Sequence, residues 1–379
     1  MPHYKFDQIA FNITDKKMPE PGDEKMYIGL EHLDSGSLKI TRWGSEVELT
    51  GQKLVMRKGD VLFGRRNTYL RRAAIAPHDG IFSAHGMIFR PKTQVIDPEY
   101  FPFFISSNYF MDAAIRISVG SLSPTVNWKT LKELEFDLPS LEEQRRNAAL
   151  LKSINETKEA YQELLIQTDN LVKSQFIEMF GDLDKNTKQF PNRKLNEISA
   201  YWNGLTYKPA DAVEAGSGTL VLRSSNIQDG SLAFDDNVYV GCTIKEKLFV
   251  QDNDILMCSR NGSAALVGKT ALIKGLTEPT TFGAFMMIIR SDYYSYLKTY
   301  FETPFFRNKI STGTSTINQI TGKMLNEISL PVPDMDTVRR FEEFTHQSDK
   351  SKFELKEAIK SCDALMKAIL FTNLEEKEG

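Results

Sequence analysis

The sequence contains little cysteine and no long apolar run, and both shortages exclude classes of protein. Its 379 residues include three cysteines, Cys242, Cys258 and Cys362, without the C-x-x-C spacing of a zinc site or the even number of a disulfide framework. No run of about 18 apolar residues is present to cross a bilayer, and the first residues lack the pattern of a secretion signal. We expect a cytoplasmic protein that is neither exported nor membrane-spanning.

Positive net charge is also missing. The 47 Lys and Arg residues face 50 Asp and Glu residues, which gives a formal net charge of −3 and a sequence pI of about 6.1. Any surface for nucleic acid or for an anionic membrane must therefore be local. With 41% hydrophobic and 26% charged residues the composition is that of a globular protein, and the length allows about two or three domains.

Signatures of catalysis are absent as well. The five histidines show no metal-ligand spacing. Gly268-Lys269-Thr270 lacks a glycine at the position that a phosphate-binding loop requires, so we interpret it as a loop and a strand. A nuclease-like pattern of Asp334 with Glu354 and Lys356 is better explained by charges on the solvated face of a long helix. We predict no catalytic residue, no metal and no cofactor on this chain.

The sequence does contain an internal repeat. Three pairs of segments match at an offset of 194 residues: 33–38 with 227–232, 59–62 with 253–256, and Arg66-Asn67 with Arg260-Asn261. Phe82–Arg90 then matches Phe282–Arg290 at an offset of 200. The offset returns to 194 for a last set: Leu131, Leu134, Phe136, Leu138, Pro139, Arg145 and Arg146 with Leu325, Ile328, Leu330, Val332, Pro333, Arg339 and Arg340. This register predicts a duplicated architecture.

Each copy combines a β-rich part with a long helix. Short β-branched runs separated by Gly, Asn and Pro favour strands, with some helix around 98–117 and 293–310. Apolar residues at alternating spacings of four and three then predict the seam of a coiled coil. The predicted seam residues, which would pack one helix on the other, are Tyr161, Leu165, Thr168 and Val172 in the first copy and Leu355, Ile359, Cys362, Met366 and Ile369 in the second.

The starts of the two helices carry capping signals. Ser140 followed by Glu143 has the spacing of a capping box, and Asp334 offers a cap in the second copy. From Leu141 to about Phe180 no Gly or Pro interrupts the pattern, and Gly181 supplies a stop. A helix of forty residues spans about 60 Å.

The predicted fold class is α+β. We expect two β-rich domains separated by two long helices that pair as an antiparallel coiled coil, with an internal pseudo-twofold repeat. The predicted ranges are 1–139 for the first domain, 140–189 for the first spacer helix and linker, 190–333 for the second domain, and 334–379 for the second spacer helix and tail. Symmetry of this kind in a DNA-binding protein usually matches a target with two half-sites. An ordinary core-facing helix surface would also produce such stripes.

Two motifs accompany the repeat. Gly59-Asp60-Val61-Leu62 and Asn253-Asp254-Ile255-Leu256 are similar to a G-D-I-L turn and strand, and Leu138–Arg146 is similar to an I-P-x-P-x-x-E-Q-x-x-I helix start. The second copy of that start, Val332–Arg340, has no Glu-Gln pair. Together with the duplicated layout, these motifs resemble the specificity (S) subunit of type I restriction–modification systems, and the resemblance covers essentially the whole chain.

The resemblance implies a function and a set of partners. It implies two target-recognition domains, each of which reads one half of a bipartite site in double-stranded DNA, and helices that measure the spacer. Two modification (M) subunits would methylate adenine N6 with S-adenosylmethionine, and two restriction (R) subunits would use ATP, with Mg, to translocate and cleave. This chain would be the non-catalytic specificity subunit, in keeping with its lack of the Pro-Pro pair that a similar adenine methyltransferase would need.

A local basic cluster supplies candidate DNA contacts. Residues 53–92 contain nine Lys and Arg against two Asp, and Arg and Asn are the side chains that read guanine and adenine. The predicted DNA-binding residues are Arg65, Arg66, Asn67, Thr68, Tyr69, Arg71 and Arg72 in the first copy and Ser259, Arg260, Asn261 and Lys269 in the second. Asp60 and Asp254 are interpreted as turn residues that open a strand. Ordinary surface charges on a hairpin remain the alternative for the arginines.

Two other classes of function stay open. A symmetric coiled-coil adaptor with protein-binding domains would keep its partners when Arg66 and Arg260 are replaced by alanine. A standalone methyltransferase would bind its cofactor without any partner subunit.

Overall fold

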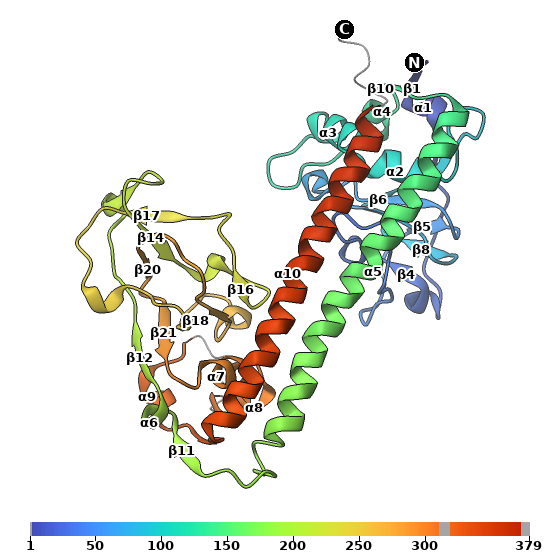
Figure 1. Cartoon of the computed structure of the whole chain (residues 1–379). Coiled ribbons are helices and arrows are strands. Elements are labelled where there is room, and N and C mark those ends of the chain that lie inside the picture. The colour runs from blue at the N-terminus through green and yellow to red at the C-terminus, as the bar shows by residue number, and fades with distance from the viewer. Residues whose placement is uncertain (1, 311–318, 373–379) are drawn as a thin grey trace. The chain divides into compact units, whose positions relative to one another are not determined.

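The computed structural model of the protein describes residues 2–310 and 319–372, so the end of the predicted tail, residues 373–379, lies outside the described residues. The chain divides into two compact units, Met1–Glu163 with Leu355–Gly379, and Leu164–Glu354 (Figure 1). The division falls inside both long helices, so each unit contains one β-rich part and a portion of each helix. The four predicted domain ranges stay predictions.

The first unit is built on two four-stranded sheets. Its strands are β1 (His3–Lys5), β2 (Ala10–Ile13), β3 (Lys16–Lys17), β4 (Tyr27–Ile28), β5 (Lys53–Met56), β6 (Val61–Phe63), β7 (Ala73–Ile75), β8 (Gly80–Phe82), β9 (Met87–Pro91) and β10 (Glu135–Asp137). The sheet orders are β2-β9-β6-β7 and β3-β5-β8-β4, and β1 pairs separately with β10. The short helices are α1 (Phe6–Ile9), α2 (Phe101–Ser106), α3 (Asn108–Arg116) and α4 (Trp128–Leu131).

The second unit repeats much of this arrangement. Its strands are β11 (Asn192–Lys194), β12 (Ala200–Asn203), β13 (Ala212–Val213), β14 (Thr219–Leu222), β15 (Ile227–Gln228), β16 (Ser231–Leu232), β17 (Val238–Val240), β18 (Ile255–Cys258), β19 (Thr270–Leu272), β20 (Thr280–Phe282), β21 (Met286–Arg290) and β22 (Ser329–Pro331). The sheet orders are β12-β21-β18-β19 and β13-β17-β14-β20, with β11 paired to β22 and β15 to β16. The helices are α6 (Leu195–Ile198), α7 (Tyr294–Phe301), α8 (Pro304–Ile310) and α9 (Gly322–Asn326).

The duplication is therefore visible in strand order. In each unit one antiparallel sheet has its four strands in equivalent order, β2-β9-β6-β7 in the first unit and β12-β21-β18-β19 in the second. A separate two-stranded pair, β1 with β10 or β11 with β22, has its last strand just before the long helix. The other sheets share a parallel pair, β4 with β8 and β14 with β20. They differ in the third strand, because β5 pairs with β8 in the first unit whereas β17 pairs with β14 in the second.

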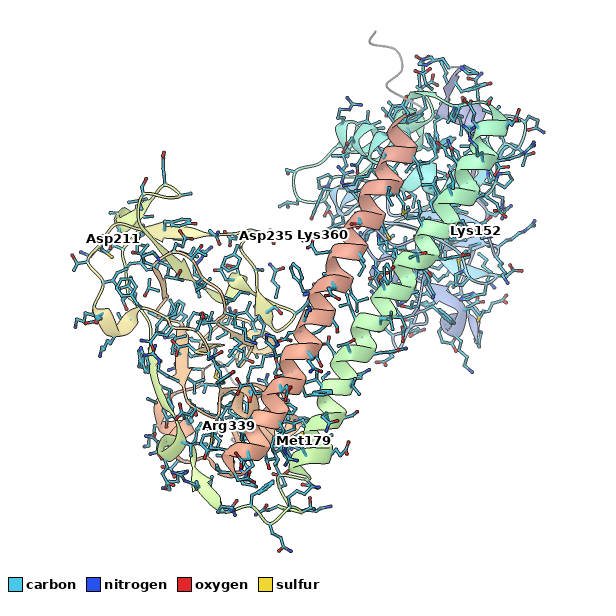
Figure 2. All side chains as sticks on the ribbon, viewed as in Figure 1. Lys152, Met179, Asp211, Asp235, Arg339 and Lys360 are labelled. Carbon is cyan, nitrogen blue, oxygen red and sulfur yellow. The ribbon has the colours of Figure 1, made fainter. Side chains whose placement is uncertain are left out.

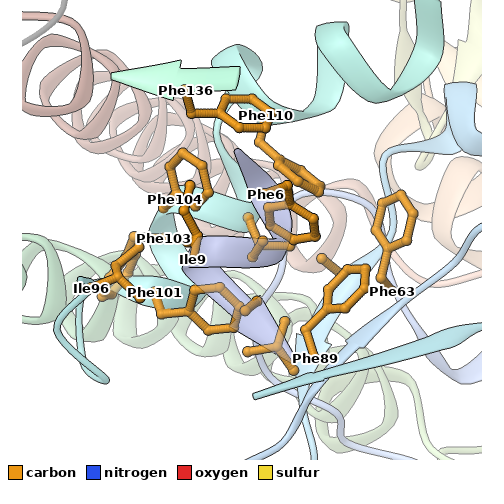
Figure 3. Close-up of a cluster of buried hydrophobic side chains, with 14 of the residues drawn as sticks. Phe6, Ile9, Phe63, Phe89, Ile96, Phe101, Phe103, Phe104, Phe110 and Phe136 are labelled. Carbon is orange, nitrogen blue, oxygen red and sulfur yellow. The ribbon is translucent and has the colours of Figure 1, made fainter. Parts of the chain in front are cut away.

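Aromatic side chains fill the core of the first unit. Phe6, from the short helix α1, contacts Phe89 of β9 and Phe110 of α3 with ring centroids 5.2 and 5.1 Å apart (Figure 3). Phe110 stacks on Phe136 of β10 at 5.6 Å. Edge-to-face and offset ring contacts of this kind add to the free energy of burial. This cluster ties both ends of the β-rich part to one core.

The two long helices are α5 (Leu141–Phe180) and α10 (Met335–Thr372). Their predicted starts are confirmed: the Ser140 hydroxyl accepts from Glu143 N, the Glu143 carboxylate accepts from Ser140 N, and Asp334 accepts from Thr337 N. Gly181 has φ +74° and its N–H donates to Ile177 O, which ends α5 as predicted. In Figure 2, Lys152 and Lys360 lie on the parts of α5 and α10 in the first unit, and Met179 and Arg339 on the parts in the second.

The missing Glu-Gln pair of the second copy has a structural explanation. Gln144 is fully buried near the start of α5, where its amide accepts from Asp97 N and donates to Val95 O and Pro139 O. At the equivalent place on α10 the chain has Val338, which is fully buried in the apolar core of the second unit. A hydrogen-bonded amide in one unit is thus replaced by apolar packing in the other.

Candidate nucleic-acid interface

The predicted DNA-contacting segment of the first unit connects β6 to β7. Gly64 N donates to Arg72 O and closes the connection, and a short 3₁₀ helix covers Thr68–Leu70. Asn67 and Arg71 flank that helix in the left-handed region, with φ of 53° and 48°. The connection is therefore a compact folded loop whose backbone orients each side chain.

Two of the predicted arginines stabilise the loop itself. The Arg71 guanidinium pairs with Asp112 and donates to Asn108 Oδ1 of α3 at 3.2 Å. Arg72 donates to Leu30 O at 2.9 Å and to Arg66 O at 3.1 Å, and burial lowers the pKa of its guanidinium. These contacts hold both guanidinium groups against the rest of the unit, and the DNA-binding role of the two arginines stays a prediction.

The remaining loop residues divide by exposure. Thr68 is buried and its hydroxyl donates to Arg65 O. Arg65 and Asn67 are half-buried, whereas Arg66 and Tyr69 are exposed, Tyr69 to 56%. Within the part of the chain that the structure describes, Arg65 Nε and Asn67 Oδ1 are buried atoms without a hydrogen-bond partner. Of the predicted DNA-binding residues in this loop, Arg66 and Tyr69 are therefore the ones exposed to solvent.

A second loop, which the sequence analysis missed, lies against this one. Residues 119–125, called here the Leu122 hairpin, are joined by a bridge between Val119 and Thr125. Thr125 also forms a bridge with Arg66, and the Arg66 guanidinium lies 3.4 Å from Ser123 Oγ. Gly120, with φ +111°, and the nearby Pro124 are turn residues that could have revealed the hairpin.

The second unit repeats this pairing of loops. Arg260 follows β18 and forms an isolated bridge with Gln319, the same pair of positions as Arg66 and Thr125 after a shift of 194 residues. Arg260 is exposed, and its guanidinium carbon lies 5.5 Å from the ring centroid of Phe285. Phe285 is itself 61% exposed, unlike Phe82, Phe89 and Phe282, which are buried. Arg260 and Phe285 together form an exposed cation–π pair.

The other predicted residues of the second unit are less accessible. Ser259 is buried, and its hydroxyl donates to Phe285 O at 2.9 Å. Asn261 donates to Ser224 Oγ and accepts from Ser263 N, and Lys269 is half-buried where β19 begins. Arg260 is therefore the direct counterpart of Arg66, while Ser259 and Asn261 shape the loop around it.

Lys269 lines a pocket of about 480 Å³ that has a simple origin. Arg71 and Gly268 each stand two residues before the second strand of their hairpin, and both have positive φ. The Arg71 side chain reaches α3, whereas Gly268 has no side chain and leaves a space in which Arg307 of α8 donates to Val267 O. Gly268 therefore lines the pocket without a side chain to fill it.

The predicted turn role of Asp60 and Asp254 is confirmed, but each has a further role. Their carboxylates accept from Arg57 N and Gln251 N, which closes the turn before the strand. Each also receives two hydrogen bonds from an arginine: Asp60 from Arg90 at 2.6 and 2.9 Å, and Asp254 from Arg290 at 2.6 and 2.7 Å. The sequence contained a signal for this pairing, since Arg90 and Arg290 are the last residues of the repeated segments 82–90 and 282–290.

The predicted seam residues lie on the least exposed faces of α5 and α10. Cys362 is buried, and the other eight are half-buried, while most of their neighbours along each helix are exposed. Among described residues, direct contacts between the helices include Lys158 with Asp363 in the first unit and Lys352 with Asp169 in the second. Phe341 of α10 also contacts Phe176 and Phe180 of α5.

Within residues 2–310 and 319–372, no group of His, Cys, Asp and Glu side chains could hold a metal ion. No helix in the same ranges is long and apolar enough to cross a membrane.

Known proteins are similar to this chain in sequence and in fold. Residues 11–167 match the model of the type I restriction modification DNA specificity domain. The chain is 24% identical over 325 residues to the EcoKI specificity subunit of Escherichia coli K12, across 78% of this chain and 68% of that protein. It is 26% identical over 188 residues to the StySPI specificity subunit of Salmonella potsdam, across 46% of this chain and only 40% of that protein.

Solved structures share the fold. The S subunit of a type I restriction–modification system from M. genitalium superposes with a TM-score of 0.53 at 15% identity, over 97% of this chain and 95% of that one. A chain from a type I restriction–modification complex studied for its assembly and conformational transition gives a TM-score of 0.54 at 19% identity, over 98% and 97%. At these identities the likeness concerns the fold, which is a mixture of helix and sheet.

Proposed function

We propose that this chain is the DNA-recognition subunit of a type I restriction–modification complex, because residues 11–167 match the DNA specificity domain of such systems and the chain is similar to their specificity subunits. Each β-rich part reads one half of a bipartite site in double-stranded DNA. The main support for the proposal is the pair of exposed arginines, Arg66 and Arg260. They occupy equivalent positions of the repeat and form equivalent β-bridges, with Thr125 and Gln319. Two equivalent readers in one chain suit two half-sites.

We propose further that α5 and α10 pair as an antiparallel coiled coil with pseudo-twofold symmetry. Lys158 of α5 pairs with Asp363 of α10 at 2.7 Å, and Lys352 of α10 pairs with Asp169 of α5 at 3.2 Å. Lys352 and Asp363 are the repeat equivalents of Lys158 and Asp169, so one ion pair occurs twice with the helices exchanged. A twofold axis between antiparallel helices produces this exchange. It supports the proposal that the paired helices set the distance between the two half-sites.

The partners follow from the same proposal. M subunits would carry S-adenosylmethionine and methylate adenine N6, and R subunits would carry ATP and Mg and cleave DNA. This chain would have no catalytic activity and would work in the cytoplasm. Exposed apolar residues on the helices, Leu164 and Leu171 on α5 and Leu365 on α10, supply surface on which M subunits could pack.

Selection of binding sites from a random duplex library tests the function. The full chain, alone and with its M subunits, should enrich two short motifs separated by a fixed gap. Binding should weaken steeply as salt rises, because phosphate contacts release counterions. Enrichment of no motif by either preparation would contradict the proposal, and salt-insensitive binding to a protein partner would favour the adaptor.

A further inference from the structure

The tip of the Leu122 hairpin exposes an apolar side chain without cover. Leu122 is 94% exposed and Val119 is 61% exposed. Between and beside them lie Gly120, Ser121 and Ser123, which are small or polar. Single exposed apolar side chains are common on protein surfaces, so it is position that points to an interaction: loops carry binding residues disproportionately, and this leucine lies at a loop tip beside a predicted DNA-binding residue.

The hairpin is held in a defined place. Val119 N donates to Thr125 O at 3.1 Å and Thr125 N donates to Val119 O at 2.9 Å. The Thr125 hydroxyl donates to Ser123 O at 2.9 Å inside the turn. Because the two arms are cross-linked by these bonds, Leu122 is presented from a small structured turn.

The same hairpin is joined to the loop between β6 and β7 that contains Arg65 and Arg66. Asn67 N donates to Pro124 O at 2.7 Å, and Val126 N donates to Arg65 O at 3.0 Å. The Arg66 guanidinium donates to Ser123 Oγ at 3.4 Å. A surface that Arg66 reaches is therefore also within reach of the hairpin, and the two loops form one recognition surface.

The chemistry of this surface fits duplex DNA better than a protein. Arg65 and Arg66 bring positive charge beside the hairpin, and phosphates are the matching partner. An apolar contact with the thymine C5-methyl group is a standard means of reading that base in the major groove. A protein interface would need a larger apolar core around its anchor than one leucine among glycine and serines supplies.

We propose that the Leu122 hairpin enters the major groove beside Arg66, with Leu122 in contact with a thymine methyl group in the half-site read by the first unit. This inference rests on the proposed DNA-recognition function. It adds a specificity-determining residue that acts through apolar contact, in a unit whose predicted readers were all polar or charged.

The test uses the full chain and the bipartite duplex that binding-site selection identifies. Affinity is measured by competition for duplexes in which each thymine in turn is replaced by uracil, which lacks only the methyl group. For the wild-type chain, one uracil in the first unit's half-site should weaken binding roughly fourfold, which is the effect of burying about one methyl group. Leu122→Ala should weaken binding to the thymine duplex similarly and lose the discrimination against uracil.

Val47→Ala is the matched control. Val47 is 75% exposed on another loop of the same unit, and its replacement should change neither affinity nor thymine preference. Leu122→Ala should keep the wild-type melting temperature, because the side chain has no packing to lose. Changes in the other half-site should affect Leu122→Ala and the wild type equally.

Two results would overturn the inference. If Leu122→Ala kept the wild-type affinity and the wild-type preference for thymine, Leu122 would not contact a thymine methyl group. An equal loss on the bipartite duplex and on a random duplex would show that Leu122 reads no base. A wild-type chain that binds both duplexes equally would instead remove the proposed function, and this inference with it.

Discussion

At the scale of single residues, two buried carboxylates are held by several hydrogen bonds each. Asp60 and Asp254 are 4% and 1% exposed, and a buried charge is tolerated only when it is paired and hydrogen-bonded. Each closes a turn and receives two hydrogen bonds from one arginine, Arg90 or Arg290. Both copies keep the pair, which anchors the turn before β6 and β18 to the neighbouring strand.

Replacing Asp254 by asparagine should reveal the value of that pair. Asp254→Asn keeps an oxygen for the turn but leaves Arg290 without its counter-charge. We expect the free energy of unfolding to fall by about 2–3 kcal/mol, measured by urea denaturation. Asp235→Asn, at an exposed position of the same unit, should change it by less than about 0.5 kcal/mol. Equal effects of the two variants would contradict this role.

Arg66 and Arg260 differ from the other arginines of the candidate interface because they are exposed. Arg66→Ala should relax specificity at one base pair of one half-site and weaken binding by about 1–3 kcal/mol, with stability unchanged. Arg260→Ala should do the same in the other half-site. Binding-site selection with each variant separates the two effects. Identical changes in the same half-site would contradict the assignment of one half-site to each unit.

At the scale of elements, the helices were more predictable than the loops. The limits of α5 follow from a capping box and a glycine stop, which are local signals, and the structure confirms them. The positions of Arg71 and Arg72 could not be predicted, because their partners Asp112 and Leu30 are about forty residues away in the sequence. The Leu122 hairpin was missed for a similar reason, since its significance lies in its contact with Arg66.

The cap of α10 makes a prediction about pH. Hydrogen bonding from Thr337 N lowers the pKa of Asp334 in the folded protein, so the carboxylate stabilises the fold above the unfolded pKa of about 4. Asp334→Ala should cost about 1 kcal/mol at pH 7. The difference from wild type should shrink as pH falls through the folded pKa. Asp336→Ala, 89% exposed, is the control, and an Asp334 effect that persists at pH 2 would contradict the role of charge.

The paired helices make a prediction about charge order. Lys158, whose side chain is 10% exposed, pairs with Asp363 and also donates to Gly36 O. Lys158→Asp should destabilise the protein by about 2–3 kcal/mol, and adding Asp363→Lys should recover part of the loss. Denaturation of the single and double variants measures the recovery.

The matched control for this exchange is an exposed pair on one helix. Lys360 pairs with Glu357 on α10, where the side chains are 73% and 50% exposed. Exchanging their charges should change stability by less than about 0.5 kcal/mol. Failure of Asp363→Lys to recover any stability in the Lys158→Asp background would contradict a direct interaction across the helices.

At the scale of the whole molecule, the duplication was predictable because matching segments recur in the sequence at a nearly constant offset. Equivalent strands follow in the same order in one sheet of each unit. The differences between the units were not predictable, since a third strand attaches to β8 in one and to β14 in the other.

The central claim is that this one chain sets a split DNA target for its complex. Mapping N6-methyladenine across the genome, in cells that carry the chain with its M subunits and in cells that lack only the chain, tests it most directly. The account predicts a motif of two short sequences with a fixed gap that is methylated only when the chain is present. A methylation pattern that is unchanged by its loss, with M-subunit expression confirmed, would contradict the account.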